Sequence, residues 1–157
     1  MEDDDENYDP RYFSGLEFWE RETGMEDLSQ RYVEHQVFIM YHGTTMANAL
    51  KIQLEGFVPS TDGMLGRGVY LSRDIKKASA YPKNAGAESR AVIQVKVQVG
   101  LVRKIWYQGH PLQKTWHMHG YDTAWVPPKC GMVPSGLEED CVYDPRRIEV
   151  LQIFQNE

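Results

Sequence analysis

Residues 37–44 read Val-Phe-Ile-Met-Tyr-His-Gly-Thr, a short apolar run that leads directly into a polar turn. Five consecutive apolar residues predict a buried strand over residues 37–41, which delivers His42, Gly43 and Thr44 at its end. Further along, residues 66–72 read Gly-Arg-Gly-Val-Tyr-Leu-Ser. Here we expect a glycine-containing loop over residues 59–67, followed by a second short strand over residues 68–72. These two motifs are the most informative pair in the chain.

The segments around the two motifs predict short helices and further strands. Thr45 can cap a helix that runs through residue 54, and Gly56 can close it in the left-handed conformation. A second helix over residues 74–81 would end at Pro82. Residues 91–99 alternate between apolar and polar, as a half-exposed strand does, and strands are also expected near 123–126, 139–143 and 148–154. Two helices with at least five strands, without regular strand-helix alternation, indicate an α+β fold.

The length of 157 residues suits one domain. Six acidic residues and no basic residue stand in residues 1–10, so we expect a disordered acidic leader there. An N-terminal arm and helix over residues 11–36 would pack on the main domain, residues 37–157. The net charge of −6 is that of the leader, so the remainder is neutral overall. This balance argues against nucleic acid as a partner.

The sequence also limits the cellular compartments in which we expect the protein. The longest apolar run, residues 37–41, is far shorter than a membrane span, and the acidic N-terminus is unlike a signal peptide. We therefore expect a monomer in the cytoplasm or the nucleus, with Cys130 and Cys141 as free thiols. A zinc site at His117, His119 and Cys130 would lack a fourth ligand at a convincing spacing, so no metal is predicted.

The two opening motifs resemble the H-G-[ST] and G-x-G-[IV]-Y motifs of the catalytic domain of the poly(ADP-ribose) polymerases (PARPs). Four further segments are similar to that family in the same order: Lys77-Ala78-Ser79-Ala80-Tyr81, the strand over residues 91–100, Tyr121-Asp122-Thr123 and Glu139-Asp140-Cys141-Val142-Tyr143-Asp144. The resemblance implies an ADP-ribosyltransferase fold, with split antiparallel-rich sheets and short flanking helices. It also implies NAD as the co-substrate and an unknown protein as the acceptor of ADP-ribose.

The same resemblance assigns roles to individual residues. His42, Tyr70 and Glu139 would be the catalytic residues, with His42 on a ribose hydroxyl and Glu139 beside the charge that develops on the nicotinamide ribose. The backbone of Gly43 would bind the nicotinamide amide, and Tyr70 and Tyr81 would stack on its ring. The implied cofactor-binding residues are His42, Gly43, Thr44, Gly68, Tyr70, Ser79 and Tyr81.

Strand alternation bears on which acid points into the cleft. In an extended segment Glu139 and Cys141 share one face, and Asp140 takes the other. Only one of Glu138 and Glu139 can face the cleft, and a register shift of one residue would make Glu138 or Asp140 the inward acid.

One position departs from the family pattern. Ala78 stands where the family has the helix serine that binds the nicotinamide amide, and Ser79 comes one residue later. This departure leaves open an inactive module that binds NAD, ADP-ribose or a protein. An RNA 2'-phosphotransferase, which shares a His-Gly-Thr, is a third hypothesis, but the further histidine and arginine that it needs have no clear place here.

Within the PARP superfamily, the small size, the acidic leader and residues 121–127 are similar to the reovirus-induced, interferon-inducible PARP-like family of fish. This narrower resemblance implies a role in innate antiviral defence.

Overall fold

A computed structural model describes residues 28, 36–80, 86 and 89–155 of the chain. The predicted leader, almost all of the predicted arm and helix over residues 11–36, and Tyr81 lie outside these residues. From residues 1–36 only Leu28 and Gln36 are described, and Leu28 is fully buried in the larger of two hydrophobic clusters. The division into leader, arm and domain stays a prediction.

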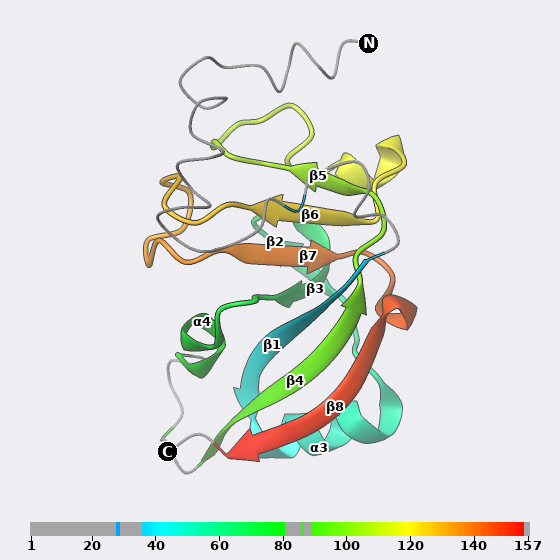
Figure 1. Cartoon of the computed structure of the whole chain (residues 1–157), viewed down its shortest axis with the longest axis vertical. Helices are drawn as coiled ribbons and strands as arrows, with labels where there is room; N and C mark the ends of the chain where they lie inside the picture. The colour runs from blue at the N-terminus through cyan, green and yellow to red at the C-terminus, as the bar shows by residue number, and fades with distance from the viewer. Residues whose placement is uncertain (1–27, 29–35, 81–85, 87–88, 156–157) are drawn as a thin grey trace.

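The described residues form two β-sheets with short helices at their sides (Figure 1). A three-stranded antiparallel sheet has the order β1-β4-β8, and a five-stranded sheet has the order β2-β3-β7-β6-β5, in which only β5 and β6 pair in parallel. The strands are β1 (Val37–Thr45), β2 (Ser60–Gly63), β3 (Gly66–Leu71), β4 (Arg90–Gln98), β5 (Val102–Lys104), β6 (Thr123–Val126), β7 (Glu139–Val142) and β8 (Ile148–Gln155). The predicted α+β fold with antiparallel-rich sheets is confirmed.

The helices among the described residues are short. They are α3 (Met46–Glu55), α4 (Ile75–Ser79) and the 3-10 turns η3 (Trp116–His119) and η4 (Pro145–Arg147). The Thr45 side chain caps α3 by accepting a 3.1 Å hydrogen bond from the Asn48 N–H, and Gly56 closes it at φ 91°. The start of this helix agrees with the sequence prediction. At its end, Gly56 is the closing residue as predicted, but its ψ of 170° lies outside the left-handed helical conformation that was predicted, and the helix extends one residue further, to Glu55. No helix in the described part of the chain has the length and hydrophobicity to span a membrane.

The predicted loop over residues 59–67 was wrong, because most of it is a β-hairpin made by β2 and β3. Nothing in Ser60-Thr61-Asp62-Gly63 alternates between apolar and polar, so the sequence carries no strand signal there. The turn of the hairpin is stabilised by Tyr70, a residue of β3 that lies outside residues 59–67. The Tyr70 hydroxyl accepts a 2.9 Å hydrogen bond from the Leu65 N–H and donates a 2.5 Å bond to the Gly66 carbonyl. Strand β5 was also missed.

The two sheets meet at a short junction. The Tyr41 N–H donates to the Ser72 carbonyl at 2.7 Å, and the Ser72 N–H donates to the Tyr41 carbonyl at 3.0 Å. Tyr41 lies in β1 of one sheet, and Ser72 directly follows β3 of the other. The junction therefore brings the ends of the two opening motifs together, and it positions the site.

A candidate NAD-binding active site between the two sheets

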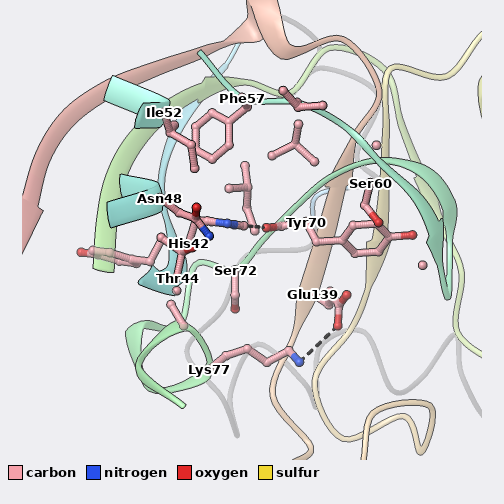
Figure 2. A pocket seen from close by; sticks show the side chains of 18 of the residues that line it. His42, Thr44, Asn48, Ile52, Phe57, Ser60, Tyr70, Ser72, Lys77 and Glu139 are labelled. Carbon is pink, nitrogen blue, oxygen red and sulfur yellow. Dashed lines mark hydrogen bonds and ion pairs between the residues drawn. The ribbon is translucent and has the colours of Figure 1, made fainter. Parts of the chain in front are cut away.

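A cavity of about 600 Å³ lies where the two sheets and α3 meet. Side chains from β1, α3, β3, α4 and β7 point into it (Figure 2). The wall combines apolar side chains with a few polar groups, which is the usual character of a small-molecule site. Of the predicted site residues, the cavity brings together His42, Gly43, Thr44, Gly68, Tyr70 and Glu139.

His42 is oriented by the neighbouring strand. Its Nδ1 lies 2.8 Å from the Tyr70 carbonyl oxygen, and since a carbonyl only accepts, Nδ1 carries the proton. Burial lowers the pKa of His42, against a smaller opposing effect of this hydrogen bond, so the ring is neutral at physiological pH. Nε2 is then a hydrogen-bond acceptor, suited to a hydroxyl group. Phe57 holds the ring from the side, edge to face, at 5.2 Å between centroids.

The backbone of Gly43 opens toward the cavity because of its position in β1. The N–H and C=O of Tyr41 both bond to Ser72, on the edge of β1 that faces away from β4. Alternate residues of a strand direct these groups to the same edge, so those of Gly43 point the same way. On this edge, no described residue forms a hydrogen bond with the Gly43 N–H or C=O. They offer one donor and one acceptor to a ligand, which matches a primary amide.

Tyr70 and Glu139 share one face of the five-stranded sheet. Tyr70 pairs with Cys141 across β3 and β7, and Glu139 lies two residues from Cys141 on the same face. Gly63 allows the hairpin to close on the Tyr70 ring, because a methyl group there would overlap the ring. Gly68 lets β3 approach β7, because a methyl group there would overlap the Cys141 sulfur. Burial is the main cause that raises the pKa of Tyr70, so the phenol stays protonated.

Glu139 forms an ion pair with Lys77 of α4. The Lys77 Nζ lies 3.2 Å from a Glu139 carboxylate oxygen, and the two side chains are 13% and 15% exposed (Figure 2). An ion pair this shielded from water fixes the position of the Glu139 carboxylate on the cavity wall. Of the two candidate acids, Glu139 is the one on the cavity wall, and Glu138 is fully buried elsewhere.

Two predicted site residues are not placed on the cavity wall. Ser79 is not among the described residues that line it, whereas Ala78, its neighbour in α4, is. Tyr81 lies outside the described residues, so its stacking against Tyr70 stays a prediction. The helix therefore presents a methyl group where the PARP pattern has a hydroxyl.

The contribution of α3 to the cavity wall was not predicted from the sequence. Four residues of α3 line it at helical spacing: Asn48, Lys51, Ile52 and Glu55. Positions i, i+3, i+4 and i+7 lie on one face of a helix, so this stripe was available as a signal once the helix was predicted. Lys77 was also missed, although it stands inside the quoted helix motif.

In the part of the chain that the structure describes, no group of three or more His, Cys, Asp or Glu side chains is arranged to hold a metal ion. Cys130 and Cys141 are free thiols.

The cavity therefore offers a ligand an imidazole nitrogen, a backbone N–H and C=O, and a carboxylate. A family model of the poly(ADP-ribose) polymerase catalytic domain matches residues 16–123, which is more than half of the chain. The chain belongs to this family. The match includes His42 and Tyr70 and ends before Glu139, so the place of Glu139 rests on the fold alone. A comparison with curated proteins found no significant match.

Proposed function

We propose that this protein is a mono-ADP-ribosyltransferase, which uses NAD to transfer one ADP-ribose unit to a protein or another nucleophile. The observation that carries the proposal is that His42 and Glu139, from two different sheets, line one cavity. Family membership supports NAD as the co-substrate.

The chemistry follows from what each group offers. Departure of neutral nicotinamide breaks the bond between its ring nitrogen and the ribose C1', and the ribose takes on oxocarbenium character. The Glu139 carboxylate stabilises that charge, most strongly in the transition state, and its position on the cavity wall supports this role. The backbone of Gly43 holds the leaving amide, and Nε2 of His42 accepts from a ribose hydroxyl. The nucleophilic atom of the acceptor then bonds to C1', and its proton is released to solvent.

Lys51 fits the diphosphate of NAD. Lys51 and Lys77 are the only lysines among the described residues that line the cavity, and no arginine stands there. Lys77 already faces Glu139, and Lys51 has no ion pair with any described residue. A diphosphate carries two negative charges, which an ammonium group on the face of α3 would partly neutralise.

The test is incubation with NAD labelled in its ADP-ribose part. We expect label on protein, nicotinamide released in proportion to it, and no label on nucleic acid. Each modified site should carry one ADP-ribose unit after digestion to single residues. Release of nicotinamide without label on any acceptor would point to hydrolysis of NAD. Longer ADP-ribose chains would contradict mono-transfer.

A second candidate is a module on the same fold that binds NAD or ADP-ribose, or a protein, without turnover. The observation that favours it is Ala78 on the cavity wall, because the methyl group cannot donate a hydrogen bond to the nicotinamide amide. Loss of one such bond costs about 1 kcal/mol. This candidate would be supported if calorimetry shows that NAD binds and if the bound NAD is recovered intact after hours. Restored turnover in Ala78→Ser would show that the missing hydroxyl is the reason.

The biological setting rests on the narrower resemblance of residues 121–127 to interferon-inducible PARP-like proteins. On that basis we propose an antiviral role in the cytoplasm or nucleus. Induction of the transcript by interferon or double-stranded RNA is the expected result. Constant expression under both treatments would remove the support for this role.

A further inference from the structure

Glu138, the neighbour of Glu139 on β7, is a fully buried acid that the proposed mechanism does not use. Its carboxylate accepts four hydrogen bonds. One oxygen accepts from the Trp125 indole N–H at 2.8 Å and from the Arg73 Nε at 3.2 Å. The other accepts from the Arg73 backbone N–H at 2.5 Å and from the Ser72 hydroxyl at 3.0 Å. The donors come from β6 and from the segment that joins β3 to α4.

Ser72 extends this network to β1. Its backbone makes the two-bond junction with Tyr41, the residue before His42. Its hydroxyl also bonds to the Glu138 carbonyl oxygen at 2.7 Å. One short path of hydrogen bonds therefore joins the backbone next to His42 to the backbone next to Glu139.

The same hydroxyl supports the start of α4. The Asp74 N–H donates to Ser72 Oγ at 3.0 Å, and the Asp74 side chain caps α4 by accepting from the Lys76 N–H at 2.9 Å. Lys77, the next residue, reaches back to Glu139. Both partners of the ion pair in the cavity are thus carried by segments that bond to Glu138.

Stability alone is a weak explanation for this carboxylate. A buried ion pair is often no more stabilising than apolar side chains of similar volume, because both charges lose their hydration. A fixed set of four donors instead specifies one arrangement of the segments around it. Catalytic groups need such fixing, since misplacement by about 1 Å can lower a rate about a hundredfold.

We propose that Glu138 is a positioning residue, which sets the place of the Glu139 carboxylate and of its Lys77 partner on the cavity wall. The proposal rests on the proposed function, since it assigns Glu138 a role that acts through Glu139.

The test is a double-mutant cycle of Glu138→Gln and Glu139→Gln on the full chain, with the rate of nicotinamide release and the affinity for benzamide as readouts. Glutamine keeps the size of Glu138 but presents an NH₂ to one of its present donors. We expect Glu138→Gln to lower turnover about tenfold or more and to change benzamide affinity less than about threefold. In the Glu139→Gln background the same change should alter turnover less than about twofold. An equal loss in both backgrounds overturns the proposal.

A structural readout separates this proposal from the proposed function. The side-chain ammonium resonance of Lys77 in nitrogen-15 NMR reports its ion pair whether or not the protein turns over NAD. We expect this resonance to shift or broaden in Glu138→Gln. An unchanged resonance overturns the positioning role, and a wild type that releases no nicotinamide overturns only the enzyme.

Thr123→Val is the matched control. It removes a buried hydrogen bond on β6, the 2.7 Å bond from the Thr123 hydroxyl to the Val99 carbonyl, which lies outside the Glu138 network. The Lys77 resonance and turnover should be unchanged in it, and a shift as large as that in Glu138→Gln would contradict the proposal. If Glu138→Gln does not fold, Ser72→Ala takes its place. It removes the hydroxyl that bonds to the carboxylate and the carbonyl of Glu138 and that accepts from the Asp74 N–H, and it leaves the backbone junction with Tyr41. It should then show the same pattern of effects, at a smaller size.

Discussion

Three consecutive acids on β7 occupy three different environments. Glu139 faces the cavity and pairs with Lys77, and Glu138 is buried with four donors. Asp140 is buried beside Glu138, and no described residue donates a hydrogen bond to either of its carboxylate oxygens. Burial, and then the negative charge of Glu138, raise the pKa of Asp140 well above its usual value. Alternation along the strand separates Glu139 from the other two, and only the packing around them separates Glu138 from Asp140.

Asp140→Asn is expected to stabilise the protein above pH 7. In the folded state Asp140 holds its proton at pH values where the unfolded chain has released it. Stability is therefore lost as the pH rises from the unfolded pKa of 3.8 through the raised folded pKa. Asparagine removes this titration and can donate to Glu138, so we expect a gain of about 1 kcal/mol or more. Urea denaturation at pH 5 and pH 8.5 measures it, and a variant less stable than wild type at pH 8.5 would refute it.

His42→Ala is expected to weaken NAD binding about tenfold, because it removes one acceptor for a ribose hydroxyl. The pH dependence of wild-type affinity is a sharper test. Protonated His42 has no acceptor, and burial lowers its pKa below 6.5, so affinity should hold as the pH falls from 8 to 6.5 and decline only below that. Calorimetry across this range checks it. A decline centred at pH 6.5 or above would mean that His42 is not neutral in the way described.

The β2-β3 hairpin shows how one side chain holds an element that its own sequence does not favour. The Tyr70 hydroxyl bonds to both Leu65 and Gly66 at the turn, and Gly63 lies against the ring. Tyr70 therefore fixes the wall of the cavity in addition to any contact with a ligand.

Tyr70→Phe is expected to destabilise the protein by about 1 to 2 kcal/mol, since the Leu65 N–H loses its acceptor. Hydrogen exchange at the Leu65 amide should quicken in parallel. Tyr107→Phe is the control, because Tyr107 is 41% exposed and its hydroxyl has no hydrogen bond with a described residue. Equal stability of Tyr70→Phe and Tyr107→Phe would show that the hairpin does not depend on the hydroxyl.

Elements with their own local signals could be predicted from the sequence. Strands β1 and β4 are apolar or alternate, and α3 has Thr45 at its start and Gly56 at its end. Strands β2 and β5 are short, and their pairing with distant strands decides them, so no local pattern marks them. The place of Glu139 needed the pairing of β3 with β7, because periodicity alone left the register open by one residue.

At the scale of the whole molecule, the cavity is lined by residues from both sheets. His42 belongs to the three-stranded sheet, and Tyr70 and Glu139 belong to the five-stranded one. Motif order predicted that these residues belong together, but it could not predict the Ser72 junction, which depends on a contact between residues far apart in the chain. A ligand that bridges the sheets should stabilise both as one unit.

Benzamide, which carries the same amide and ring as nicotinamide, is expected to raise the melting temperature of the whole protein. At a hundred times its dissociation constant, mass action contributes about 2.7 kcal/mol, which is several degrees for a domain of this size. Differential scanning calorimetry should show one transition that moves as a unit. If saturating benzamide moves no transition, the cavity does not take the nicotinamide group.

The most direct test of the central claim compares turnover with binding in Glu139→Gln. We predict NAD affinity within about threefold of wild type and nicotinamide release at least about a hundredfold slower, because the lost interaction is made mainly in the transition state. Glu149→Gln, which alters an exposed ion pair with Lys96, is the control and should match wild type in both. Release by Glu139→Gln within about twofold of wild type, or a wild type that binds NAD and releases no nicotinamide, would contradict the assignment of this cavity as an ADP-ribosyltransferase active site.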